Sequence, residues 1–157
     1  MSRPTLIPDP PPGSTLAPPS PTPLPEDPVE ILARTLWGEA RGEGAAGMEA
    51  VAAVVVNRLK AGRPRWGLDL GAVCLARRQF SCWNPGDPNR AKLLAVTPAD
   101  PAFATALRIA RRAASGLLPD PVLGATHYHT RGVMPGWSIG QRPVATIGRH
   151  LFYAGIA

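Results

Sequence analysis

Apolar residues recur at helical spacing in the first stretch of the chain that is not dominated by proline. One broad hydrophobic face is formed by Ile31, Leu32, Leu36 and Ala40. Asp27 is suited to cap this helix, Pro28 to its first position and Glu30 to a capping box. Gly42 and Gly44 are expected to end it. The pattern therefore predicts an amphipathic helix that begins at Pro28 and stops at the two glycines.

A second predicted helix covers residues 45–60 and is apolar around most of its circumference. Its inner face carries Met48, Val51, Ala52, Val55, Val56 and Leu59. Because the flanking Ala53 and Val54 are also apolar, we expect this helix to be the buried centre of the domain. Asn57 and Arg58, near its end, are interpreted as structural residues.

Two further helices are predicted downstream. Residues 71–75 form a short apolar segment that leads into a run of aromatic and polar residues at 77–86. Asp100 and Pro101 start a longer helix, which Gly116 ends. Its inner face carries Phe103, Leu107, Ala110 and Ala114. The arginines on its outer side are interpreted as a solvated basic face.

After residue 124 the pattern changes from helical spacing to alternation. Residues 125–130 and 144–153 are each predicted to form a strand, separated by a loop that contains glycine, proline and Trp137. We expect the two strands to form a small antiparallel sheet beside the helices. The predicted fold class is therefore α+β and mostly helical.

Proline divides the chain into two regions. Eleven of the twenty prolines fall within residues 1–28, and the chain has 157 residues in all. We predict a disordered proline-rich linker or tail over residues 1–27 and one domain over residues 28–157. The formal net charge of +6 comes mainly from arginine. It favours an anionic partner, such as a nucleic acid, an acidic membrane surface or an acidic wall polymer.

No segment has the properties of a membrane-spanning helix or of an ordinary export signal. The chain lacks a run of about 18 apolar residues, and its N-terminus lacks the apolar core of a signal peptide. If the protein acts outside the cytoplasm, we expect another component to carry or release it.

The two cysteines, Cys74 and Cys82, lie eight positions apart. Two free buried thiols are the default expectation for a chain without an export signal. A disulfide between them is the alternative, if the protein matures in an oxidising compartment. A zinc site is not expected, because the spacing is not that of a CxxC motif.

Glu39 is the strongest candidate for catalysis. It lies near the C-terminal end of the first helix, where the helix dipole is negative, and apolar neighbours are expected to desolvate it. Both effects favour a protonated carboxyl, which is the group that cleavage of a glycosidic bond needs. The alternative is a solvated glutamate at a frayed helix end. A mechanism with two catalytic carboxylates would need Glu43, Asp69 or Asp87 as the second one. None of the three is clearly placed for that role, which favours a mechanism with a single acid.

The three histidines offer a second chemistry. His127 and His129 share one strand face, and His150 is expected on the neighbouring strand, so the three are a candidate zinc site of an amidase or peptidase. Against this interpretation, the chain has no HExxH motif, and no acid follows Asp120 to orient the ligands. The alternative is that these histidines stack or form hydrogen bonds. A third alternative is a basic module without catalytic activity that binds nucleic acid or cell wall.

Several segments together resemble the SleB/CwlJ-type family of cell-wall hydrolases. They are residues 37–43, Gly47, residues 51–58, residues 79–81 with Trp83, and residues 126–129, 135–137 and 147–153. The resemblance covers about residues 29–155 in the order and spacing of the family. Their combination is more specific than any one of the segments.

This resemblance implies a lysozyme-like fold and activity on the glycan strands of peptidoglycan, at the MurNAc–GlcNAc backbone. Spore-cortex members of the family act as lytic transglycosylases, which close a 1,6-anhydro-muramoyl ring instead of adding water. An N-acetylmuramoyl-L-alanine amidase label also exists for the family. Because the chain shows no signal peptide and no separate wall-binding domain, it fits a lysin of a phage or of a gene-transfer particle.

The resemblance maps the catalytic acid to Glu39, which we expect to protonate the glycosidic oxygen and then to deprotonate the muramoyl C6 hydroxyl. Polarity and resemblance together predict a glycan cleft lined by Gln79, Ser81, Tyr128, Trp137 and His127. Glu43 is the rival acid, and pairing with Arg41 would make it structural. We expect no cofactor, no nucleic-acid partner and a monomeric protein.

Overall fold

The structure, a computed structural model, describes residues 23–77 and 79–157. Most of the predicted linker, residues 1–22, therefore lies outside the described residues. The helices are α1 (Pro28–Ala40), α2 (Gly44–Ala61), α3 (Leu70–Leu75), α4 (Pro88–Ala95) and α5 (Pro101–Ala114). The strands are β1 (His127–Thr130), β2 (Ala145–Ile147) and β3 (His150–Tyr153). Short 3-10 turns lie at Arg41–Glu43, Pro64–Trp66, Ser81–Trp83 and Gly136–Ser138. None of the described helices is long and apolar enough to cross a membrane.

Aspartates begin four of the helices, because each accepts a hydrogen bond from a backbone N–H of the first turn. The capping residues are Asp27, Asp69, Asp87 and Asp100. A cap of this kind stabilises a helix by about 1 kcal/mol. The expected capping box at α1 is wrong, since Glu30 pairs with Arg34 instead, with 2.8 Å between Oε1 and Nη2.

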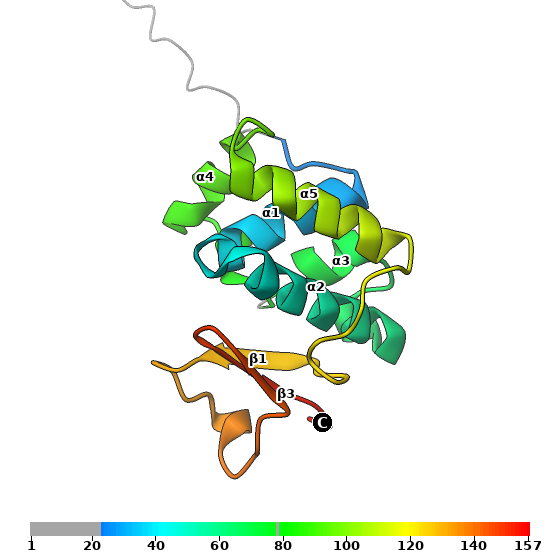
Figure 1. The fold of residues 1–157 in the computed structure, drawn as a ribbon, viewed down its shortest axis with the longest axis vertical. Coiled ribbons are helices and arrows are strands. Elements are labelled where there is room, and N and C mark those ends of the chain that lie inside the picture. Colours follow the sequence, from blue (N-terminus) through cyan, green and yellow to red (C-terminus); the bar gives the residue numbers. More distant parts are fainter. Residues whose placement is uncertain (1–22, 78) are drawn as a thin grey trace, which may run out of the picture.

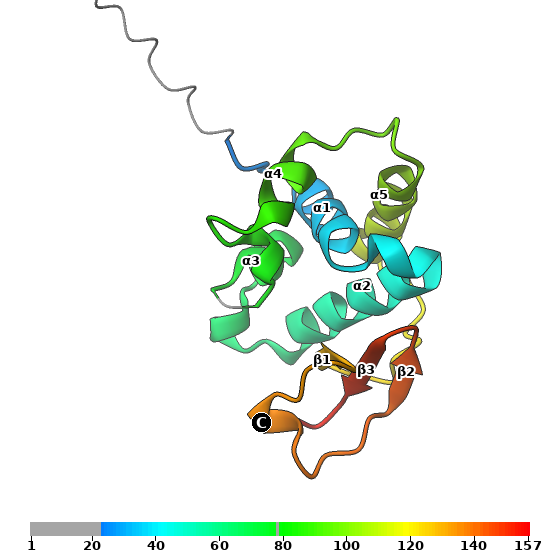
Figure 2. The same ribbon diagram turned by 90° about the vertical axis from the view of Figure 1, so that its left-hand side faces the viewer.

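Helix α2 lies between the other helices and the sheet, as both views of the ribbon show (Figures 1 and 2). One side of α2 packs with α1 and α5 through residues that include Val51, Ala52 and Val55. The other side contributes Ala50, Ala53 and Val54 to a second cluster with Phe152 of β3. The prediction of a buried central helix is confirmed, because α2 is apolar both on the side that faces the helices and on the side that faces the sheet.

The three strands form an antiparallel sheet in the order β1-β3-β2. Residues directly opposite one another in such a sheet project from the same face. The register pairs Tyr128 with Phe152 and His127 with Tyr153. One face, which packs on α2, therefore carries Tyr128, His150 and Phe152, and the opposite face carries His127, His129 and Tyr153.

Two predictions about the strands need correction. The single strand expected over residues 144–153 is instead β2 and β3, joined by a two-residue turn at Gly148 and Arg149. Gly148 adopts a positive φ of 57°, which suits a hairpin turn. The first strand begins at His127, two residues later than expected.

Helix α4 was not predicted from the sequence. Leu93 is its one fully buried residue, so the helix shows no repeat of hydrophobic positions.

The disulfide alternative for Cys74 and Cys82 is wrong, because both are free thiols in the structure. Cys74 is fully buried and Cys82 is 2% exposed. Burial raises the pKa of the Cys74 thiol to about 12 and raises the pKa of Cys82 further. Both therefore behave as small core residues, as the default expectation held.

Candidate active site

Glu39 lies in the last turn of α1, where the helix end is closely packed. A Cβ at the preceding Gly38 would approach Cys82 Cβ and Leu93 Cδ2 to 3.1 Å each. Glycine at this position therefore lets the Ser81–Trp83 turn and α4 pack closely against the end of α1. This packing fixes the part of the backbone that carries the Glu39 side chain.

Tyr128 reaches Glu39 from the sheet. Its hydroxyl donates a hydrogen bond of 2.9 Å to Glu39 Oε2. The ring is held between aromatic neighbours, with its centroid 5.1 Å from that of His150 and 5.6 Å from that of Phe152. Burial raises the pKa of Tyr128, and the negative charge of Glu39 raises it further. The phenol therefore stays protonated and acts as a donor.

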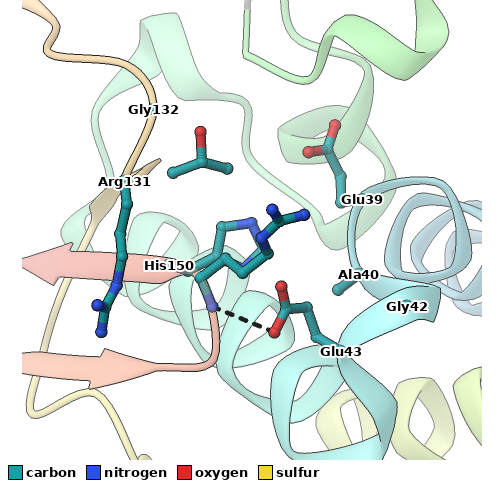
Figure 3. Close-up of a pocket in the computed structure, with 9 residues that line it drawn as sticks. Glu39, Ala40, Gly42, Glu43, Arg131, Gly132 and His150 are labelled. Atoms are coloured by element: carbon teal, nitrogen blue, oxygen red, sulfur yellow. Dashed lines mark hydrogen bonds between the residues drawn. The ribbon is translucent and has the colours of Figure 1, made fainter.

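A cavity of about 540 Å³, here called the glutamate cavity, opens beside Glu39. Its lining consists of Glu39, Ala40, Gly42, Glu43, Thr130, Arg131, Gly132, Arg149 and His150. Glu39 and Glu43 enter from the helical side, and Arg131 and Gly132 lie on the opposite side (Figure 3). The cavity thus lies at the boundary between the helices and the sheet.

Glu43 is bound to the β2–β3 turn. Its Oε2 accepts a hydrogen bond of 3.2 Å from the backbone N–H of Arg149. A Cβ at Gly148 would collide with the same oxygen, so the turn needs glycine at this position. The expected pairing with Arg41 is wrong, because the Arg41 guanidinium stacks 4.1 Å from the ring centroid of Trp37. The contact of Glu43 in the structure is instead with the hairpin turn.

His150 adds an unusual polar group to the glutamate cavity. Its side chain is 4% exposed. Within residues 23–77 and 79–157, its Nδ1 is the one buried side-chain nitrogen or oxygen without a hydrogen-bond partner. Burial lowers the pKa of His150, while the charges of Glu43 and Glu39 oppose that effect. The imidazole is therefore neutral near pH 7 and keeps hydrogen-bonding capacity that the protein does not use.

A second cavity of about 370 Å³, here called the arginine cavity, lies on the other side of Tyr128. Its lining consists of Arg58, Arg65, Trp66, Gln79, His127, Tyr128 and Trp137. The His127 ring centroid lies 5.6 Å from that of Trp66 and 5.0 Å from that of Trp137. Tyr128 lines this cavity, and its hydroxyl donates to Glu39, which lines the glutamate cavity, so this hydrogen bond links residues of the two cavities.

The structure brings most of the predicted site residues together. Gln79, His127, Tyr128 and Trp137 all line the arginine cavity. Ser81 is exposed at the start of its turn and lines neither of the two cavities.

Arg58, interpreted from the sequence as a structural residue of the helix end, lies at a cavity that the sequence did not predict for it. Arg58 is 6% exposed and lines the arginine cavity. It continues the helical stripe of Val51 and Val55 at the i, i+4, i+7 positions. A charged residue on an otherwise buried stripe is the feature that could have identified it.

The three histidines do not form the candidate zinc site. His127 and His129 project from one face of the sheet and His150 from the other. His129 is also engaged, since its Nε2 lies 2.8 Å from the Tyr153 hydroxyl. Among the described residues, no group of three His, Cys, Asp or Glu side chains is arranged to hold a metal ion. The residues therefore do not fit the three-histidine zinc site that the sequence suggested.

Comparison with known sequences matches residues 42–153 to the family described as Cell Wall Hydrolase. A spore cortex-lytic enzyme of Halalkalibacterium halodurans is 31% identical over 125 residues, which are 79% of this chain and 34% of that protein. The chain thus spans about a third of the length of that curated relative.

Two solved structures resemble the fold. The catalytic domain of the germination-specific lytic transglycosylase SleB from Bacillus anthracis is 25% identical, with a TM-score of 0.63 over 85% of this chain and 98% of that one. The catalytic domain of the Bacillus cereus SleB protein is also 25% identical, with a TM-score of 0.62 over 80% and 88%. The predicted fold, mostly helical with a small antiparallel sheet and lysozyme-like, is confirmed.

Proposed function

The chain belongs to the cell wall hydrolase family, and on that basis we propose that it cleaves the glycan backbone of peptidoglycan as a lytic transglycosylase. We assign Glu39 as its acid and base. The observation that carries this assignment is the hydrogen bond from Tyr128, which lines the arginine cavity, to Glu39, which lines the glutamate cavity. The family match begins at residue 42, so the choice of Glu39 rests on the site and not on that match.

In the first step, Glu39 acts as a general acid. Tyr128 binds Oε2, so Oε1 is the oxygen that we assign to proton transfer. The proton moves from Oε1 to the oxygen that links C1 of MurNAc to the next GlcNAc. The C1–O bond then breaks, its electron pair stays with the departing oxygen, and C1 gains oxocarbenium character.

In the second step, the Glu39 carboxylate acts as a general base. It takes the proton of the muramoyl C6 hydroxyl, and the C6 oxygen forms a bond to C1. The product end is a 1,6-anhydro-muramoyl ring, no water is consumed, and Glu39 is protonated again. One carboxyl group suffices for both steps. Glu43 is therefore not needed as a second catalytic carboxylate, which agrees with its hydrogen bond to the hairpin turn.

We assign the aromatic and polar residues at the arginine cavity to binding of the glycan. Trp137, His127 and Tyr128 offer faces and edges on which sugar rings pack, and the Gln79 amide offers hydrogen bonds. Ser81 is the outlying member of this set, and its contact with the glycan would require the strand to extend beyond both cavities.

Digestion of purified sacculi tests the proposal. Wild type and the Glu39→Gln and Glu43→Gln variants are compared, and the released fragments are identified by mass spectrometry. We expect anhydro-muramoyl ends from wild type and from Glu43→Gln, and a loss of about 100-fold or more in Glu39→Gln. Full activity of Glu39→Gln would end the assignment. Reducing muramoyl ends would indicate a hydrolase, and free stem peptides would indicate an amidase.

We further propose that the protein acts as a monomer on the wall, outside the membrane, after holin-like release or delivery on a particle. Producing cells should then stay intact until their membrane is permeabilised and lyse afterwards. Lysis without permeabilisation would contradict this route, and sedimentation of the purified protein as a dimer would contradict the monomer.

A further inference from the structure

The arginine cavity contains a buried charge whose partners in the protein are neutral. Arg58 is 6% exposed. Its Nε donates to the Thr126 carbonyl at 2.7 Å, and its Nη1 donates to Gln79 Oε1 at 2.8 Å. Among the described residues, the one ion pair within 4.0 Å joins Arg34 to Glu30. Arg58 therefore has no carboxylate in direct contact there; burial lowers its pKa, and the charge of Glu39 opposes that effect only from a longer distance. Burial of a charge without a contacting partner is costly.

Two further arginines increase the positive charge around this cavity. Guanidinium carbons of Arg63, Arg65 and Arg58 lie 4.4, 5.4 and 5.6 Å from the ring centroid of Trp66. None of the described residues that line the cavity is acidic. The pKa of His127 is lowered to about 4, first by burial and then by these three arginines. His127 therefore stays neutral near pH 7 and leaves the positive charge to the guanidinium groups.

The walls of the cavity suit a sugar. Trp66, Trp137 and His127 surround the space beside Arg58, and the Gln79 amide adds polar atoms. Aromatic walls pack on the apolar faces of sugar rings, and arginine binds carboxylates in preference to neutral groups. A glycan that carries a carboxylate matches both features at once.

Resting on the proposed function, we propose that the arginine cavity is a carboxylate subsite of the glycan cleft. It receives a carboxylate of the muramoyl substituent, with Arg58 at its floor and Arg65 at its exposed side. Two sources share this chemistry. One is the free lactyl carboxylate of a muramoyl residue without a peptide, and the other is a carboxylate of an attached stem peptide.

The first test measures digestion of sacculi and of glycan strands from which an amidase has removed the peptides. Each substrate is used as isolated and after its carboxylates have been converted to neutral amides with carbodiimide and ammonia. We expect amidation to raise the KM of wild type about tenfold, in line with a charge-assisted hydrogen bond. A rise in KM on amidation of the peptide-free strands alone would identify the lactyl carboxylate as the ligand. A rise in KM on amidation of sacculi alone would identify a carboxylate of the stem peptide. No effect on either substrate would overturn the proposal.

The variants Arg65→Gln and Arg112→Gln each remove one exposed arginine, from the cavity and from α5 respectively. Arg65→Gln should raise the KM for unmodified substrate about tenfold and lose most of the discrimination against amidated substrate. Arg112→Gln should discriminate as wild type does, which controls for the overall basic charge. Equal discrimination by the two variants would contradict the subsite. Arg65 carries this test because replacement of the buried Arg58 also removes its bonds to Thr126 and Gln79.

A binding measurement separates this proposal from the proposed catalysis. Glu39→Gln is mixed with native and with amidated sacculi, and the bound fraction is measured by pelleting. Tighter binding to native sacculi, lost in the Glu39→Gln Arg65→Gln double variant, supports the subsite whatever reaction the enzyme performs. If Glu39→Gln stays active, the proposed mechanism fails while the binding comparison still decides the subsite.

Discussion

The hydroxyl of Tyr128 donates a 2.9 Å hydrogen bond to Oε2 of Glu39, joining a strand residue to a helix residue 89 positions earlier in the chain. This contact joins the helical part of the domain to the sheet and holds the carboxylate at the edge of the glutamate cavity. The geometry of the site therefore depends on the sheet staying packed on α2.

Replacement of Tyr128 by Phe should reduce kcat about 100-fold, because it removes the donor that orients Glu39. The fold should remain, since the ring still packs beside His150 and Phe152. Tyr153→Phe is the matched control, because it removes a hydroxyl that contacts His129 on the opposite face of the sheet. Steady-state kinetics and thermal unfolding of both variants check the prediction. Similar kcat values for the two variants would contradict it.

Gly148→Ala should lower the free energy of unfolding by about 2–3 kcal/mol, because a side chain there is strained by the positive φ and displaces the Glu43 carboxylate. Gly86→Ala controls for the strain alone: its φ is +84°, and a Cβ would meet nothing within 4 Å. Urea unfolding of both variants gives the difference. In a Glu43→Ala background the cost of Gly148→Ala should fall, and an unchanged cost would show that the two residues are not coupled.

The free energy of unfolding should decrease as the pH is lowered from about 6.5 towards 4. His127 has a pKa of about 4 in the folded protein against an ordinary value of 6.5. The unfolded chain therefore binds more protons across this interval, and stability rises with pH through it and is complete above 6.5. The effect of His127 should be about 1–2 kcal/mol, after allowance for its partial exposure.

Urea unfolding of His127→Gln at several pH values checks the cause. The dependence on pH should weaken in this variant and persist in His129→Gln. His150, whose pKa is also lowered by burial, should maintain a smaller dependence of the same sign. A His127→Gln protein with the full wild-type dependence would show that another group is responsible.

Treatment with a strong chelator should leave the release of glycan fragments unchanged, because His150 projects from the opposite face of the sheet to His127 and His129. His129→Ala should likewise retain activity on sacculi. Loss of activity that returns on addition of zinc would contradict this expectation and would support the amidase alternative.

The helices with their own caps and hydrophobic repeats could be predicted from the sequence. Helices α1, α2 and α5 combine a regular apolar face with a clear start or stop, so local patterns suffice for them. Helix α4 buries only Leu93 in the core, so the sequence shows no hydrophobic repeat from which this helix could be predicted. The turn between β2 and β3 contains Gly148, a local signal that was overlooked, and is held by a hydrogen bond to Glu43, which lies 106 residues before its partner Arg149. No local pattern contains that contact.

The candidate site was predictable in part for a similar reason. Glu39, Tyr128 and Trp137 lie in segments that resemble one family, so their roles could be inferred together. The burial of Arg58 depends on Thr126 and Gln79, which come from distant parts of the chain. In the sequence, Arg58 looks like an ordinary basic residue near a helix end. Its significance comes from its burial without an ion-pair partner within 4.0 Å, which the described residues show and the order of residues does not.

The free thiols of Cys74 and Cys82 bear on the conditions under which this domain can be made. No covalent bond between them holds the fold, and burial keeps both thiols protonated at physiological pH. Folding therefore requires no oxidant, and reducing agents have no bond to break. The domain can therefore reach this fold in a reducing compartment, without a cross-link between the two residues.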